Sequence, residues 1–135
     1  MDTFDCKDEF YRAIKRSQPS VVCEDGAISS ALFKNEDVNG NPGISVDCQD
    51  GRQREVAISF MRDWFAPRLK GVVGFTYEDV TKVKAAVFRS PSTTNPFHAE
   101  IYQDEGKGHI SNIQAIWLAK QCKLYYFDED TKWTK

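Results

Sequence analysis

The stretch DGRQREVAISFMRDWFAPRLKGVVGF, residues 50–75, predicts an amphipathic helix followed by a buried strand. Asp50 and Gln53 have the spacing of a capping box, in which side chains satisfy free amides at the start of a helix. Pro67 is expected to end the helix because proline lacks an amide hydrogen and clashes with the preceding turn. The apolar run 72–75 then has the length of a buried strand. The apolar residues at helical spacing, which should form the buried stripe, are Val56, Phe60, Met61, Trp64 and Phe65.

Upstream of this stretch, the pattern predicts one helix and three strands. Residues 6–15 carry apolar side chains at helical spacing, so we expect a helix there. The β-branched residues within 21–23 favour a short edge strand. Residues 28–33 and 44–48 look like two further strands, and the turn-forming dipeptide Asn39-Gly40 between them predicts a hairpin.

Downstream of the same stretch, we expect two more helices and the remaining strands. A short helix should follow the capping segment 76–79, and a longer one should begin at the S-x-x-Q capping box of residues 111–114. Two prolines and several hydroxyl residues make 90–96 an exposed loop. The expected strands are 84–89, 97–102 and 124–127, and residues 128–135 are expected to form a flexible acidic and polar tail.

The order of these elements predicts a single α+β domain over residues 1–135. The strand pairs within 28–48 and 84–102 are connected too tightly for parallel crossovers, so the sheet should be mixed or mostly antiparallel. About three helices packed chiefly on one face would bury the apolar stripes. The expected architecture is therefore a two-layer sandwich.

Composition limits the classes of function. The 135 residues are 41% hydrophobic and 28% charged, which is typical of a folded globular chain. The formal net charge of -2 gives no overall attraction to nucleic acid or to anionic lipid. The apolar runs are too short to span a bilayer, and the acidic start of the chain lacks the pattern of an export signal. We therefore expect a cytoplasmic protein with no membrane association.

The cysteines do not predict a metal site or disulfides. They are widely spaced, with no C-x-x-C pair and no histidine at the spacing of a zinc finger. Free cysteines commonly behave as small buried hydrophobic residues, so we expect no metal and no cofactor. The four residues concerned are Cys6, Cys23, Cys48 and Cys122.

The segment 95–101, NPFHAEI, is the best candidate for chemistry. Residues two apart on a strand point to the same face, so His98 and Glu100 should lie side by side as a general base and the carboxylate that orients it. Asp47 on another strand could bind a ligand or a histidine. The alternative is that these residues simply occupy the polar face of a half-buried strand.

Further polar residues are candidates for ligand binding, namely Arg12, Ser30 and Asn95. Arg12 could recognise a phosphate or carboxylate through two parallel hydrogen bonds. Together with Lys15 and Arg16 it would also form a basic edge, which leaves association with nucleic acid as an alternative that the net charge does not support. Such edges are more often plain solvated faces.

Four segments carry a resemblance: YRAI at 11–14, ISSALFK at 28–34, ISVD at 44–47 and NPFHAEI at 95–101. Together they resemble a pattern found in small bacterial proteins without an established activity. The resemblance spans most of the chain and implies a bacterial or mobile-element origin. A looser similarity is to ADP-ribosyltransferase-like folds, in which an early arginine, a serine-rich strand and a late glutamate follow one another, as Arg12, Ser29 or Ser30, and Glu100 do here.

The sequence therefore favours a module that binds a small ligand or a protein partner. The alternative is a small enzyme that uses His98 and Glu100 on a small or nucleotide-like substrate. A homo-oligomer is also left open, because one small core is not expected to bury all the large aromatic side chains, among them Trp64, Phe65, Trp117 and Trp133.

Overall fold

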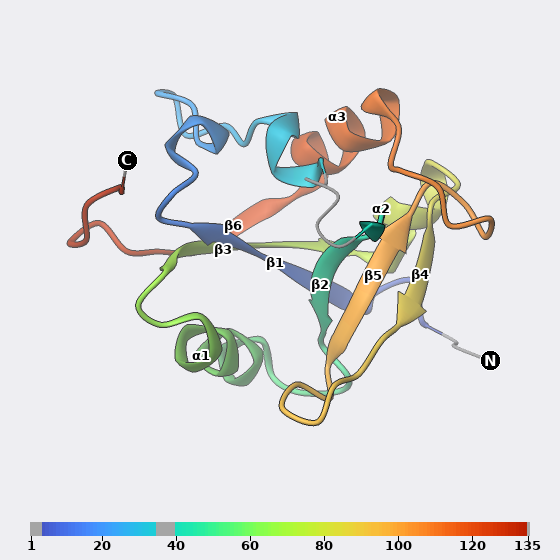
Figure 1. Ribbon diagram of the computed structural model, residues 1–135, viewed down its shortest axis with the longest axis horizontal. Helices are drawn as coiled ribbons and strands as arrows, with labels where there is room; N and C mark the ends of the chain where they lie inside the picture. The colour runs from blue at the N-terminus through green and yellow to red at the C-terminus, as the bar shows by residue number, and fades with distance from the viewer. Residues whose placement is uncertain (1–3, 35–39, 135) are drawn as a thin grey trace.

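The computed structural model describes residues 4–34 and 40–134, which form an antiparallel sheet with helices on both faces (Figure 1). The strands are β1 (Glu9–Lys15), β2 (Ile44–Cys48), β3 (Leu69–Thr76), β4 (Ala86–Arg89), β5 (His98–Tyr102) and β6 (Lys123–Phe127). The helices are α1 (Arg54–Phe65), α2 (Tyr77–Lys82) and α3 (Asn112–Gln121), with short 3-10 helices η1 (Pro19–Val21) and η2 (Ser30–Phe33). The order of strands across the sheet is β4-β5-β2-β1-β3-β6.

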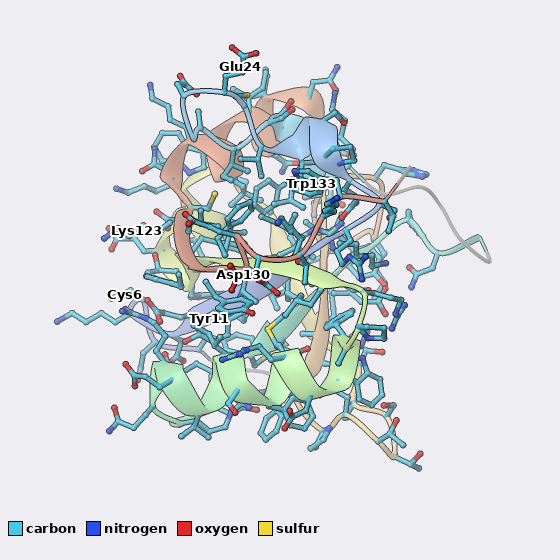
Figure 2. All side chains as sticks on the ribbon, turned by 90° about the vertical axis from the view of Figure 1, so that its left-hand side faces the viewer. Cys6, Tyr11, Glu24, Lys123, Asp130 and Trp133 are labelled. Atoms are coloured by element: carbon cyan, nitrogen blue, oxygen red, sulfur yellow. The ribbon has the colours of Figure 1, made fainter. Side chains whose placement is uncertain are left out.

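The predicted fold class, α+β with a mostly antiparallel sheet, is confirmed, and every strand pair is antiparallel. The helices are distributed over both faces of the sheet. Helix α1 buries Ala57 and Met61 against one face, where Tyr11 lies between α1 and the sheet (Figure 2). Helices α2 and α3 and the segment η2 cover the other face, where the larger core lies (Figure 1).

The predicted helix at residues 6–15 is wrong, because these residues form the central strand β1. The strand pairs with β3 along its whole length and with β2 at its start. Phe10 and Ile14 point into the larger core, and Tyr11 points into the smaller one. Apolar side chains on both faces of a strand leave no clean alternation, and their spacing then imitates a helix.

The predicted hairpin of residues 28–33 with 44–48 is also wrong. Strand β2 pairs with β1 and β5 instead, and η2 takes the place of the expected strand. Leu32 and Phe33 are both fully buried on consecutive positions, which a helical turn allows and a one-sided strand does not. The expected edge strand at 21–23 is reduced to a single bridge between Val22 and Ile28. Asn39 of the predicted turn lies outside the described residues.

The three predicted helices downstream of residue 50 are confirmed, with one difference in capping. Thr76 with Asp79, and Ser111 with Gln114, form the capping boxes of α2 and α3. Asp50 does not cap α1, whose N-cap is Gln53 without a side-chain bond. The Asp50 carboxylate instead forms an ion pair with Arg89, 2.8 Å away.

The C-terminal residues 128–134 follow β6 and contact the body of the protein. The buried ammonium group of Lys70 donates hydrogen bonds to the carbonyl oxygens of Asp128 and Thr131. The amide of Thr134 donates to the carbonyl of Arg16 at 2.8 Å, and the ring of Trp133 lies 6.0 Å from that of Phe127. None of the described helices combines the length and the apolar character that crossing a membrane requires.

Two of the four cysteines depart from the predicted burial. Cys48 is buried and Cys122 is half-buried, where burial raises the pKa of the Cys122 thiol to about 12. Cys6 and Cys23 are exposed, so the expectation of a buried thiol is wrong for them. All four thiols are free of disulfide bonds.

Candidate functional site

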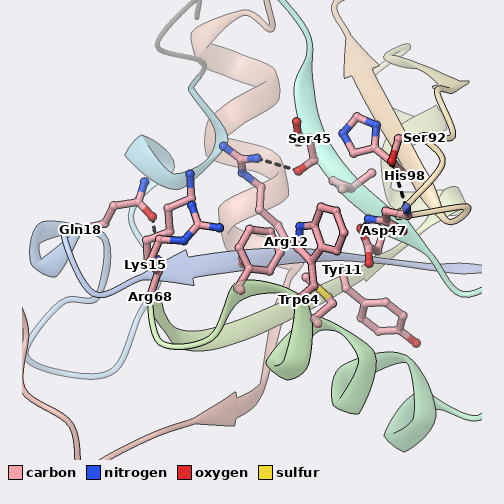
Figure 3. A pocket seen from close by; sticks show the side chains of 15 residues that line it. Tyr11, Arg12, Lys15, Gln18, Ser45, Asp47, Trp64, Arg68, Ser92 and His98 are labelled. Carbon is pink, nitrogen blue, oxygen red and sulfur yellow. Dashed lines mark hydrogen bonds between the residues drawn. The ribbon is translucent and has the colours of Figure 1, made fainter.

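A cavity of about 420 Å³ opens where β1 and β2 diverge (Figure 3). The two strands pair at Phe10 with Cys48 and at Tyr11 with Asp47, at the start of β1. Beyond this point the guanidinium group of Arg12 spans the gap and donates to the carbonyls of Leu32 and Ser45, at 2.6 and 2.7 Å. The side chain of Arg12 therefore takes the place of sheet hydrogen bonds and leaves a space that α1 closes from one side.

Asp47 is the central polar residue of this cavity. Its side chain is buried, with only 3% of the residue exposed. One carboxylate oxygen, Oδ1, accepts a hydrogen bond of 3.0 Å from the side-chain NH₂ group of Asn95. The other, Oδ2, is buried and has no hydrogen-bond partner among the described residues. Burial raises the pKa of the Asp47 carboxyl, against the opposing effects of Asn95, Arg52 and His98.

The loop before β5 fixes the direction in which Asn95 points. The side-chain oxygen of Asn95 accepts a hydrogen bond from the backbone N–H of Phe97 at 3.0 Å. The hydroxyl of Ser92 accepts one from the backbone N–H of Asn95 at 2.9 Å. Because the oxygen of the Asn95 amide is engaged with Phe97, its NH₂ group is the end that faces Asp47. The loop thus holds a donor against Oδ1 and supplies none to Oδ2.

His98 on β5 is the register partner of Asp47 on the neighbouring strand β2, and it also lines the cavity. Its Nδ1 atom is 2.8 Å from the carbonyl oxygen of Ser90. A carbonyl only accepts hydrogen bonds, so Nδ1 must carry a hydrogen in this contact. In the neutral ring, Nε2 is then the basic nitrogen.

Glu100 does not share this cavity, although it lies on the same face of β5 as His98. Its carboxylate accepts hydrogen bonds from the hydroxyl of Tyr102, at 3.2 Å, and from the amide of Asn41. The carboxylate of Glu100 and the imidazole of His98 therefore have separate hydrogen-bond partners.

The other predicted site residues divide in the same way. Arg12 and Asn95 line the cavity together with Asp47 and His98. Ser30 lies elsewhere, in a shallow hollow beside α3. The structure thus brings together four of the six candidate residues and leaves Glu100 and Ser30 apart.

Sequence reasoning missed the residues that complete the cavity. Trp64 was expected in the buried stripe of α1, yet it is 39% exposed and lines the cavity. Its ring stacks on that of Phe60, with an angle of 11° between the planes. Lys15 was expected only as part of a basic edge on a helix, and Gln18 and Arg68 were not singled out. Figure 3 shows Lys15, Gln18 and Arg68 at one end of the cavity, and Asp47, Ser92 and His98 at the other.

The charges around the cavity differ from those of the whole chain. Its lining contains the cations Arg12, Lys15 and Arg68 and one carboxylate, that of Asp47, whereas the chain has a net charge of -2. Lys15 and Arg68 are exposed and form no ion pair with another described residue. An anionic group is therefore favoured at that end of the cavity.

Among residues 4–34 and 40–134, no three His, Cys, Asp or Glu side chains gather closely enough to hold a metal ion. The sequence matches no protein-family model, and neither a curated protein nor a solved structure matches it.

Proposed function

We propose that the cavity between β1 and β2 binds a small organic ligand that donates a hydrogen bond to Asp47. The observation that carries this proposal is the buried Oδ2 atom of Asp47, which has no hydrogen-bond partner among the described residues. Leaving a buried acceptor unpaired costs about 1–3 kcal/mol, and a ligand with an N–H or O–H group would recover this free energy on binding. The volume of about 420 Å³ lies within the range of small-molecule sites.

The surroundings of Asp47 suit a binding site better than a plain structural carboxylate. The Asn95 donor is held in place by its own loop, so Oδ1 of the carboxylate is engaged before any ligand binds. The partly exposed indole of Trp64 adds an aromatic wall. A few placed polar groups beside aromatic surface are typical of small-molecule sites.

The test is a fragment screen by NMR, with small amines, amidines, amides and alcohols as the probes. We expect a subset with N–H or O–H donors to shift the indole N–H resonance of Trp64, assigned with Trp64→Phe. Asp47→Asn should abolish these shifts because it replaces the unpaired acceptor with a donor. The matched control is Glu100→Gln, which makes the same change at a buried carboxylate outside the cavity. Equal binding to Asp47→Asn and to the unaltered protein would refute the proposal.

A second candidate function is catalysis, and the tautomer of His98 favours it. The contact with Ser90 leaves Nε2 as a base beside the cavity, so His98 could take a proton from a bound molecule. In this candidate the carbonyl of Ser90 orients the ring, and Glu100 has no part in it. Slow conversion of a fragment hit, followed by NMR, should stop in His98→Gln while binding persists. Conversion that continues in His98→Gln would exclude this role.

A further inference from the structure

We infer that the ligand of this cavity is a guanine nucleotide, with its base against Asp47 and its phosphate against Lys15 and Arg68. This inference rests on the proposed function, because it assigns a chemical class to the ligand of the same cavity. It joins three observations on the cavity: the Asp47 carboxylate at one end, the cations Lys15 and Arg68 at the other, and an aromatic ring from helix α1.

The acceptor end favours guanine among the bases. An ionised carboxylate offers only acceptors, and guanine alone presents two adjacent donors on its pairing edge, the ring N1–H and the exocyclic amino group. Oδ2 of Asp47 has no partner within residues 4–34 and 40–134, and Oδ1 accepts from Asn95 and keeps a second lone pair. Adenine and cytosine would instead place a ring-nitrogen acceptor against the carboxylate.

The cationic end suits a phosphate group. Arg68 offers a planar fork of donors and Lys15 a point charge, and both are exposed beside the cavity. The side-chain oxygen of Gln18 accepts a hydrogen bond from the backbone N–H of Lys15 at 2.9 Å. The side-chain NH₂ group of Gln18 is therefore a further donor at this end. Two cations and one amide donor match a monophosphate better than a longer phosphate chain.

The distance between the two ends requires an elongated ligand. Asp47 is paired with Tyr11, and Lys15 lies four residues further along β1, about 14 Å at the usual rise of a strand. A base, a sugar and one phosphate extend over a comparable span. The indole of Trp64 lies within the same cavity, where a planar base can stack on it.

The experiment is calorimetric titration of the purified protein with GMP, AMP, guanosine and inorganic phosphate. We expect GMP to bind about fivefold or more tightly than AMP, because two parallel hydrogen bonds to one base discriminate by about 1–3 kcal/mol. Asp47→Asn should remove most of this preference. The double variant Lys15→Gln, Arg68→Gln should weaken GMP and leave guanosine unchanged, since only GMP carries the phosphate. Each variant is first checked for an unchanged circular dichroism spectrum.

The outcomes separate this inference from the proposal on which it rests. If fragments shift the Trp64 resonance in an Asp47-dependent way but no nucleotide binds, the assignment to nucleotides is overturned and the ligand site stands. If AMP binds as tightly as GMP, or phosphate alone as tightly as GMP, the role given to Asp47 in reading the base is wrong. If neither fragments nor nucleotides bind, both statements fail.

Discussion

Two buried carboxylates lie on neighbouring strands of the same sheet, and they differ in how fully they are hydrogen-bonded. Glu9 is 8% exposed and Asp47 is 3% exposed. Glu9 accepts two bonds from Arg54, at 3.0 and 2.9 Å, and one each from the hydroxyls of Tyr11 and Tyr125, both at 2.8 Å. Among the described residues, Asp47 accepts a hydrogen bond only from Asn95, on one of its two oxygens.

The two carboxylates differ in the donors that reach them. Tyr11 is the register partner of Asp47 across the sheet, yet its hydroxyl donates to Glu9, on its own strand. Burial acts to raise the pKa of Glu9, but the bonds from Arg54, Tyr11 and Tyr125 outweigh it, and the pKa lies below the ordinary 4.5. The Glu9 carboxylate thus has donors on both of its oxygens, whereas Oδ2 of Asp47 has no hydrogen-bond partner among the described residues.

The largest effect of this difference is expected from Glu9→Ala. The change leaves the buried hydroxyl of Tyr11, the partly buried hydroxyl of Tyr125 and the guanidinium of Arg54 without their acceptor, so the free energy of unfolding should fall by about 3 kcal/mol. Arg54 is 44% exposed and can return to water, which keeps the loss at the lower end for a buried pair. Urea denaturation followed by circular dichroism measures this quantity.

Tyr125→Phe is the graded control for this prediction. It removes one hydrogen bond and keeps the ring that stacks under Arg54 at 4.0 Å, so the loss should be about 1 kcal/mol. A Glu9→Ala variant no less stable than Tyr125→Phe would show that the cluster is not a structural unit.

The sequence predicted the second half of the fold better than the first. The capping boxes at 76–79 and 111–114 act locally, so their helices follow from neighbouring residues alone. β1 depends on pairing with β3, a strand far away in the sequence, and no local pattern reveals it. The Tyr125 hydroxyl on β6 and the Arg54 guanidinium on α1 likewise reach Glu9 only in the folded chain, so the cluster was not foreseen.

The candidate site was predictable only where one strand carries it. His98 and Asp47 were singled out from their own strands, and the sheet places them opposite each other. Glu100 shares the face of β5 with His98 but lies against Asn41 and Tyr102, a contact that strand periodicity cannot foresee. Trp64 fitted the apolar stripe of α1, and spacing alone does not distinguish a core residue from the wall of a cavity.

A smaller effect on stability is expected from Asp47→Asn, which sharpens the contrast with Glu9. Asparagine keeps an oxygen for the Asn95 amide and removes a buried charge, so the loss and the gain nearly cancel. The free energy of unfolding at neutral pH should remain within about 1 kcal/mol of the unaltered protein. A loss as large as that of Glu9→Ala would mean that Oδ2 of Asp47 has a structural partner.

The most gradual effect is the pH dependence of stability, in which the two carboxylates should differ in sign. Burial raises the pKa of Asp47 in the folded protein above its ordinary 3.8. The folded state therefore binds more protons than the unfolded state, so the contribution of Asp47 to the free energy of unfolding is fullest below pH 3.8 and is lost as the pH rises through the folded pKa. Glu9 has a lowered folded pKa, so its contribution to the free energy of unfolding is present above pH 4.5 and is lost as the pH falls through the folded value.

Urea denaturation over a series of pH values, with Asp47→Asn and Glu9→Gln as references, isolates each contribution. Relative to its own variant, the unaltered protein should lose stability with rising pH in the first comparison and gain it in the second. Slopes of the same sign would mean that Asp47, like Glu9, is fully paired within the chain, and the cavity would then have no open acceptor to offer a ligand.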